Sequence, residues 1–213
     1  MKLTWLGHSC FLAEQDGYRI LLDPYTGVEG YPPLAETARR AGAPAGLPVH
    51  SILCSHGHFD HNAVEEAETV PFDGPCPFTI RRVETFHDGE SGALRGTNTV
   101  HILTAGGVTA AHLGDLGHRL SPEQIAAIGP VDVLLVPVGG VYTVDAAEAK
   151  AVCEELNPRC IVPMHYRHAP YGLPNVAGVE DFLSLWPEVR RLAGPVLEAD
   201  ENGVLVPRFC EEG

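Results

Sequence analysis

Histidine and aspartate residues stand at the ends of several predicted strands, and this placement constrains the fold more than any other feature of the sequence. The short apolar run "HSILCS" leads directly into "HGHFDH", which contains His56, His58, Asp60 and His61. Other apolar runs lead into Asp23, His87, Asp115 and His165. Strand ends in α/β folds bring functional side chains to one edge of a sheet. We therefore expect these residues to meet at one site.

The rest of the chain alternates between strand-like and helix-like patterns. Apolar runs and period-two alternation predict strands in residues 2–7, 10–14, 18–23, 50–55, 78–86, 97–105, 107–115, 131–140, 159–166 and 203–209. Helices are predicted in residues 33–42, 62–69, 121–129, 145–156 and 179–192. Ser121, Pro122 and Gln124 have the pattern of a capping box with proline at the first helical position. With no repeat and no linker, we predict a single mixed α/β domain over residues 1–213.

The charge of the chain limits its partners. Asp and Glu number 28 against 14 Lys and Arg, which gives a net charge of −14. Nucleic acid and anionic membranes attract positive surfaces, so we expect neither as a partner and predict a small-molecule substrate instead. Self-association into a homo-oligomer is left open, with the Gly- and Pro-rich residues 27–48 as a candidate lid or contact surface.

Cysteine usage and the first residues favour a cytoplasmic protein. The six cysteines form no CxxC pair, and we expect reduced thiols that fill the core. The opening "MKLTWLGHSCFLAE" lacks the apolar core and cleavage site of a signal peptide. No stretch approaches the ~20 apolar residues of a membrane span. We therefore expect a cytoplasmic location.

The spacing within "HGHFDH" suits metal binding. Residues two apart in an extended loop share a side, so His56 and His58 can bind one ion. Asp60 and His61 follow the turn and point towards a second position. Imidazoles and carboxylates suit Zn²⁺, with Mn²⁺ or Fe²⁺ as alternatives. The competing interpretation is a solvated loop with a helix-capping aspartate, but the strand-end position favours a metal site completed by the distant residues His87, Asp115 and His165.

These residues give the chain a resemblance to the metallo-β-lactamase superfamily, whose HxHxDH signature is matched by His56, His58, Asp60 and His61. The combination of "GHS", "HLGD" and "PMHY" is most similar to the small stand-alone metal-dependent hydrolases of that superfamily. The resemblance extends over nearly the whole chain. It implies an α/β (α+β) fold, a four-layer αβ/βα sandwich of two mixed β-sheets flanked by helices.

The resemblance also implies a dinuclear site with two divalent ions, Zn²⁺ first among the candidates. The first ion would be held by His56, His58 and His87, and the second by Asp60, His61 and His165. Asp115 would bridge the two, and Asp23 would orient the loop from behind. His112 stands three residues before Asp115 and is the alternative to His87.

A dinuclear site predicts hydrolysis of an ester-type bond, in a lactone, a phosphodiester or a thioester, by a hydroxide that bridges the ions. The candidate catalytic residues are Asp60, Asp115 and His8. Asp60 would orient the hydroxide or accept its proton. His8, in the "GHS" turn, would protonate the leaving group or contact the substrate, with His112, His118 and Tyr166 as weaker candidates.

The sequence lacks residues that are typical of two other members of this superfamily, a true β-lactamase and a diiron redox protein. A true β-lactamase usually has cysteine at the place of Asp115, and a diiron redox protein of this fold has glutamate at the place of His58. A non-catalytic metal-containing binding protein is the other alternative. The remaining histidines, His50, His101 and His168, are predicted at the surface. Four arginines could meet an anionic substrate, although exposed solubilising side chains are the favoured interpretation: Arg81, Arg82, Arg95 and Arg167.

Overall fold

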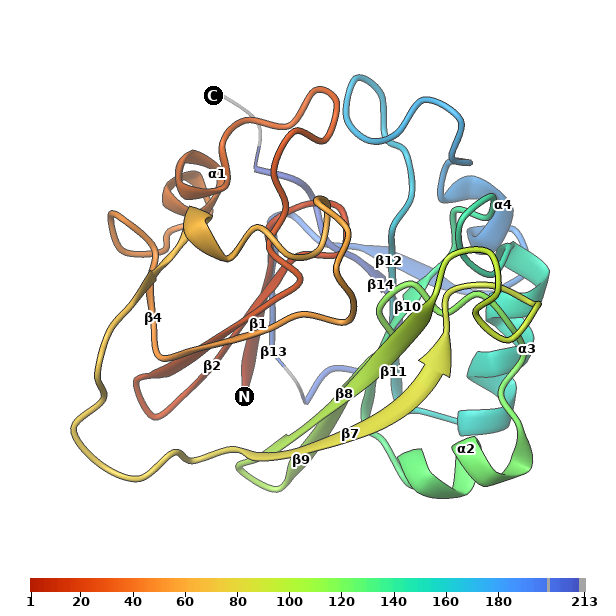
Figure 1. Ribbon diagram of the computed structural model, residues 1–213, viewed down its shortest axis with the longest axis horizontal. Helices are drawn as coiled ribbons and strands as arrows, with labels where there is room; N and C mark the ends of the chain where they lie inside the picture. The colour runs from red at the N-terminus through yellow and green to blue at the C-terminus, as the bar shows by residue number, and fades with distance from the viewer. Residues whose placement is uncertain (199, 211–213) are drawn as a thin grey trace.

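The computed structural model describes residues 1–198 and 200–210, and places two large mixed β-sheets face to face with helices on their outer sides (Figure 1). The first sheet has the order β13-β1-β2-β3-β5. Its strands are β1 (Lys2–Trp5), β2 (Phe11–Gln15), β3 (Tyr18–Leu22), β5 (Ser51–Leu53) and β13 (Val196–Glu198). A short parallel pair, β4 (Pro48–Val49) and β6 (Glu68–Thr69), lies beside it. The predicted fold class is confirmed.

The second sheet has the order β12-β14-β11-β10-β9-β8-β7. Its strands are β7 (Thr79–Phe86), β8 (Thr97–Ala105), β9 (Val108–His112), β10 (Val133–Pro137), β11 (Cys160–Met164), β12 (Val189–Arg191) and β14 (Gly203–Val206). Strands β9, β10 and β11 are parallel neighbours. Their carboxyl ends therefore lie along one edge, where the residues that follow them meet.

Successive side chains along the strands of the first sheet point to opposite faces, so this sheet lies between two apolar cores. Phe11 and Ala13 of β2 face the second sheet, whereas Leu12 between them packs on the other side. There Leu34 and Ala38 of α1 (Leu34–Arg40) cover the sheet. Since both faces are buried, these strands carry almost continuous apolar runs, and truncation of such a leucine to alanine costs about 2–5 kcal/mol.

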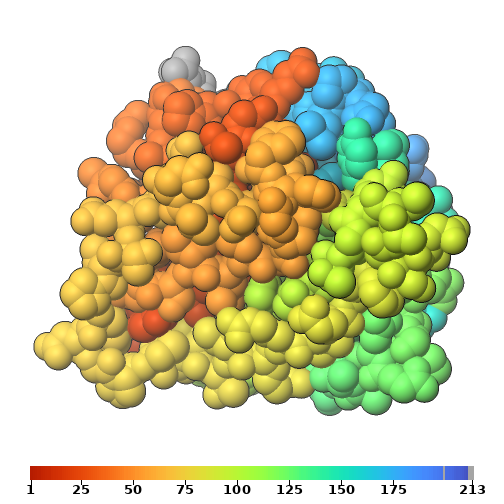
Figure 2. Space-filling model, viewed as in Figure 1, coloured from red at the N-terminus to blue at the C-terminus, as the bar shows by residue number. Residues whose placement is uncertain are grey.

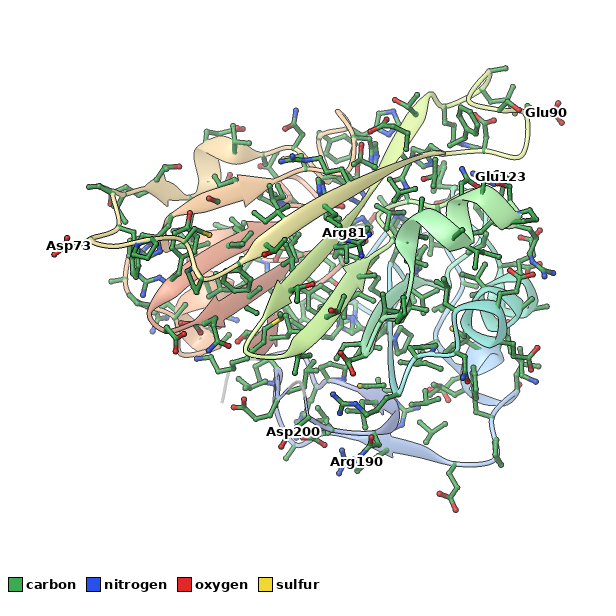
Figure 3. The ribbon with its side chains drawn as sticks, turned by 90° about the horizontal axis from the view of Figure 1, so that it is seen from below. Asp73, Arg81, Glu90, Glu123, Arg190 and Asp200 are labelled. Carbon is green, nitrogen blue, oxygen red and sulfur yellow. The ribbon has the colours of Figure 1, made fainter. Side chains whose placement is uncertain are left out.

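Helices on the second sheet begin where the sequence predicts. In α2 (Pro122–Ile128), Oγ of Ser121 accepts from the Gln124 N–H at 3.2 Å and the Gln124 Oε1 accepts from the Ser121 N–H at 2.9 Å. The predicted capping box is thus confirmed. Figure 3 shows Arg81 extended from β7 beside α2, where its guanidinium donates to the carbonyl oxygens of Ala127 and Ile128. Arg81 therefore caps a helix end.

Two predicted helices are wrong in whole or in part. Residues 62–69 form only the 3₁₀ turn η1 (Val64–Glu66) before β6, because the Ala63 N–H donates to the Pro24 carbonyl and the Val70 N–H to the Val49 carbonyl. Residues 179–192 are helical only in α4 (Glu180–Leu183), and after Pro187 the chain forms β12 against β14. Tertiary backbone hydrogen bonds outweigh the local helical pattern in both places.

The remaining helix, α3 (Ala146–Leu156), begins at Asp145 as predicted. No helix among the described residues has the length and apolarity needed to cross a membrane. The predicted surface position of His101 is wrong, because its side chain is buried and its Nε2 donates to the Cys54 carbonyl at 3.0 Å.

Candidate metal centre

The loop after β5 turns the two halves of "HGHFDH" to different sides. The His61 N–H donates to the His58 carbonyl at 3.0 Å, which closes a turn between them. The Thr26 N–H donates to the Phe59 carbonyl, and so ties the loop to the segment after β3. His58 is exposed, whereas Asp60 and His61 are buried. The backbone thus directs the first two histidines and the last two residues to separate positions.

His56, His58 and His87 form the first cluster, which we call the outer group. One ring nitrogen from each lies within 4.8 Å of the others. His87 follows β7, and its Nδ1 lies 3.0 Å from the carbonyl oxygen of Tyr142. A carbonyl can only accept, so Nδ1 carries the proton and the Nε2 lone pair is left facing the cluster.

His56 is oriented in the same way by a relay. Its Nδ1 lies 2.9 Å from Oγ of Ser55, and that hydroxyl donates to Oδ2 of Asp23 at 2.6 Å. Since the hydroxyl proton is used on Asp23, Ser55 accepts from Nδ1 of His56. The buried Nε2 of His56 has no hydrogen-bond partner among the described residues. A second lone pair therefore points into the outer group.

His8, Asp60, His61 and His165 form the second cluster, the inner group, and all four are buried. Nδ1 of His61 donates to Oδ2 of Asp23 at 2.8 Å, which turns Nε2 of His61 towards the cluster. Nε2 of His8 lies 3.2 Å from Oδ2 of Asp60. His8 and His165 have positive φ, at 50° and 51°. Such strain in non-glycine residues is typical of functional sites.

Asp115 lies between the two groups. Its Oδ1 is 3.2 Å from Nε2 of His61, and its Oδ2 is 3.4 Å from Nε2 of His87 and 3.1 Å from Nε2 of His165. The Asp115 N–H donates to Oδ1 of Asn98 at 2.9 Å. Gly114 permits this approach, because it has φ +56° and a Cβ there would lie 2.3 Å from the Asn98 oxygen.

The electrostatics favour neutral His8, His56 and His87 and ionised carboxylates, whereas the pKa of His61 is raised by Asp115 and Asp23 against the effect of burial. Burial and the neighbouring His165 lower the pKa of His8 to about 4, and burial with the neighbouring His61 lowers the pKa of His56 to about 3. Burial alone would raise the pKa of Asp60, but the hydrogen bond with His8 and the charge of His61 hold it below its usual range. Neutral imidazole and ionised carboxylate are the forms that bind metal.

The donor set fits divalent cations. Nε2 of His56, His61 and His87 converges with the Asp115 carboxylate, at 3.2 Å for His61 and 3.4 Å for His87, and in the metal-free protein the raised pKa of His61 places a proton where a cation would lie. Two ligands of one tetrahedral Zn²⁺, each ~2.1 Å away, would stand about 3.4 Å apart. Imidazole and carboxylate ligands also suit Mn²⁺ and Fe²⁺.

A pocket of about 380 Å³ opens in front of the centre. Its wall includes His58, Asp60, His87 and Asp115. The other lining residues are Phe59, Arg95, Tyr142 and Leu173. Figure 2 shows the face on which the orange loop of residues 54–62 borders the yellow-green loop of residues 88–96 on one side and the blue segment of residues 166–176 on another.

Three weaker candidates lie elsewhere. His112 donates from Nε2 to the Ser9 carbonyl at 2.8 Å and accepts the Gly114 N–H at Nδ1, so both ring nitrogens are engaged and His87 takes the place beside His56 and His58. His118 accepts the Phe86 N–H and donates to the Arg119 carbonyl. The Tyr166 ring stacks on Trp5 at 5.6 Å.

Sequence reasoning missed Ser55, Asn98 and Tyr142, which position the metal-facing side chains without belonging to the signature. Asn98 had one detectable signal, since it is a polar residue that would be buried within a long strand. The Tyr142 carbonyl and the Ser55 hydroxyl have no sequence signal, because any residue offers a carbonyl and serine is common in loops.

Known proteins of one superfamily resemble this chain over most of its length. Residues 2–165 match the family model described as the beta-lactamase superfamily domain. A UPF0173 metal-dependent hydrolase of Carboxydothermus hydrogenoformans is 28% identical over 214 residues, covering 85% of this chain and 91% of that protein. A UPF0173 protein of Pyrococcus furiosus is 34% identical over 193 residues, covering 78% of this chain and 83% of that protein.

Solved structures show the same architecture. A candidate Zn-dependent hydrolase of the metallo-β-lactamase superfamily from Thermotoga maritima superposes with a TM-score of 0.72 at 36% identity, covering 97% of both chains. Igni18, a metallo hydrolase from Ignicoccus hospitalis, superposes with a TM-score of 0.62 at 24% identity, covering 86% of this chain and 91% of that one. The second likeness concerns the fold alone.

Proposed function

The chain belongs to the metallo-β-lactamase superfamily and is a metal-dependent hydrolase, and we propose that it cleaves an ester-type bond of a small molecule at a dinuclear metal centre. The bond is that of a lactone, a phosphodiester or a thioester. In this proposal the outer group would hold one divalent ion, and Asp60, His61 and His165 would hold the other. Asp115, which lies between the groups, would contribute to both, and Zn²⁺ is the favoured metal.

Ions bound there would supply an acidified water and a polarising charge for the carbonyl or phosphoryl oxygen of the substrate. The chain's own residues perform the remaining tasks. Asp60 lines the pocket with an ionised carboxylate, so it can accept a hydrogen bond from a water and orient it. His8 does not line the pocket; it lies behind Asp60 and holds that carboxylate in place. We therefore assign His8 a positioning role.

The observation that carries the proposal is the fixed direction of three imidazoles. Nδ1 of each ring donates a hydrogen bond: His87 to the Tyr142 carbonyl, His56 to the Ser55 hydroxyl and His61 to the Asp23 carboxylate. All three Nε2 atoms then face the region of Asp115, where a divalent cation would replace the proton that His61 carries in the metal-free protein. Outer hydrogen bonds of this kind orient metal-binding histidines in proteins.

Elemental analysis of protein purified without chelator, counted per chain, tests the centre. We expect close to two ions of Zn, Mn or Fe in the wild type and about one in His87→Gln. His118→Gln, a histidine outside the pocket, should keep two. The loaded protein should then hydrolyse at least one member of a panel of lactones, phosphodiesters and thioesters.

Two results would contradict the proposal in different ways. Failure to take up metal from excess ion would exclude a metal centre. Two bound ions with no hydrolysis across the panel would favour a metal-containing binding protein with this fold.

A further inference from the structure

The pocket contains a permanent cation that the proposed hydrolysis does not use. Arg95 lines it, and within the described residues its guanidinium makes no ion pair, although acids outnumber bases by 28 to 14 in this chain. Instead the guanidinium lies over the ring of Tyr142, with Cζ 5.6 Å from the ring centroid. A cation left without an anion at the mouth of a site is available to a ligand.

The loop that carries Arg95 is built around Asp88. The Asp88 carboxylate accepts four backbone N–H groups at 2.7–3.0 Å, from Glu90, Gly92, Leu94 and Arg95. These donors occupy the carboxylate oxygens, so Asp88 is not a partner for the guanidinium. Because Asp88 directly follows His87, the loop is anchored beside the outer group. Arg95 is therefore held at a fixed place relative to the metal centre.

Tyr142 is held just as firmly. Gly140 and Val141 precede it with φ of 64° and 62°, and a β-branched residue in that region is strained. The turn sends the Tyr142 carbonyl to His87, while the Tyr142 hydroxyl accepts from Nδ2 of Asn175 at 2.7 Å. These two contacts hold the residue whose ring supports Arg95.

An exposed aromatic side chain lines the pocket, and the residues before Arg95 and Tyr142 are also exposed and apolar. Phe59 is 57% exposed and lines the pocket. Leu94 and Val141, which directly precede Arg95 and Tyr142, are 70% and 54% exposed. These are three of the six large apolar side chains that the described residues expose. An exposed aromatic side chain in the wall of a pocket indicates a ligand that covers it.

We propose that the substrate carries an anionic group, a carboxylate or a phosphate, on an apolar body. The anion binds the guanidinium of Arg95, whose planar fork matches two anionic oxygens. The apolar body packs on Phe59 and Tyr142. The ester-type bond then faces the metal centre, so this inference rests on the proposed function and makes Arg95 its specificity determinant.

Three matched phenols test anion recognition by binding: 4-hydroxybenzoate, 4-hydroxyphenyl phosphate and the neutral methyl 4-hydroxybenzoate. Calorimetry is done on both metal-free and metal-loaded protein, so that direct contact of an anion with metal is separated from contact with Arg95. We expect Arg95→Gln to weaken one or both anions by about tenfold to a hundredfold, the range for hydrogen bonds to charged groups, and to leave the ester unchanged. Whichever anion depends on Arg95 identifies the substrate group.

Arg82→Gln is the matched control, because it removes the same charge from an exposed position on β7 outside the pocket. It should bind all three phenols like the wild type. Thermal unfolding of both variants checks that the fold is kept.

The acetyl esters of the same phenols test turnover. We expect the anionic esters to exceed the neutral ester in kcat/KM by at least tenfold in the wild type, and Arg95→Gln to remove that preference. Equal hydrolysis of all three, with no effect of Arg95→Gln on binding, overturns the inference and leaves the proposed hydrolase intact. Arg95-dependent binding without hydrolysis supports the inference and counts against the hydrolase.

Discussion

The outer and inner groups of the candidate metal centre use similar side chains in different surroundings. The outer group consists of three imidazoles, and His58 among them is exposed beside the pocket. The inner group is fully buried and contains the Asp60 carboxylate, with the Asp23 carboxylate directly behind His61. Negative charge acts more strongly on a cation in a buried place than near solvent. The same loop thus offers one closed position and one open position.

This difference matches the division between structural and catalytic metal sites. Closed coordination holds an ion, whereas an open position leaves room for water and substrate. We infer that an outer ion would exchange faster and meet the substrate first, while an inner ion would be retained longer. The predictions below probe that contrast.

The largest effect is expected from Asp115→Asn, since Asp115 is the residue that both groups share. Asparagine keeps the shape but removes the negative charge that faces three imidazoles. Loss of an outer hydrogen-bond partner costs about tenfold to a hundredfold in metal affinity or activity. We expect a larger loss here, more than about a hundredfold in kcat/KM, with reduced metal content by elemental analysis. A variant that keeps two ions and activity within tenfold would show that Asp115 is not the link.

A chelator should separate the two groups by rate. We expect metal release in two phases, the faster from the outer group, when a chromogenic chelator is added to loaded protein. His58→Gln should abolish the fast phase and leave the slow one, because His58 is exposed and belongs to the outer group alone. Release in one phase from the wild type would contradict the difference between the groups.

Acid should destabilise the metal-free protein before the carboxylates are protonated. His8 and His56 have folded pKa values of about 4 and about 3, both lowered chiefly by burial from 6.5. Between those values and 6.5 the unfolded chain binds more protons than the folded one. The stability that their neutral forms contribute is therefore present above pH 6.5 and lost as the pH falls.

His61 acts in the opposite sense. Burial alone would lower its pKa, but the carboxylates of Asp115 and Asp23 raise it, so its contribution is present below pH 6.5 and lost as the pH rises through the folded pKa. Burial also lowers the pKa values of His87 and His101. We therefore expect the histidines with lowered pKa values to dominate the pH dependence of stability. Thermal unfolding of chelated protein should show the Tm falling from pH 6.5 to pH 4. A Tm that rises over this range would mean that His61 outweighs the others.

The sequence predicts the parts of the centre that depend on strand ends and on spacing. The strands β2 and β3 are visible in the sequence as apolar runs. "HGHFDH" after β5 places two histidines on one side of an extended loop. These relations are local, so the pattern of residues is enough. The predicted helices at 62–69 and 179–192 are wrong because distant backbone groups compete for their hydrogen bonds.

The supporting contacts are beyond sequence reasoning for the same reason. The Tyr142 carbonyl reaches His87 across 55 positions, and Ser55 reaches Asp23 across 32. Arg95 could be named as one of several arginines, but its place in the pocket depends on Asp88 and Tyr142 together. Such contacts follow from the packed fold and not from any short pattern.

The smallest effect is expected from Ser55→Ala, which breaks the one hydroxyl that links His56 of the outer group to Asp23 behind the inner group. The Ser55 N–H still donates to Asp23, and His61 still donates to the same carboxylate, so the inner side keeps most of its support. Removal of the hydroxyl leaves Nδ1 of His56 without its acceptor and should cost about 1 kcal/mol of unfolding free energy, measured in urea. If the groups are separate, the fast phase of metal release should quicken while the slow phase stays unchanged. A change in both phases would mean that Asp23 couples the two positions.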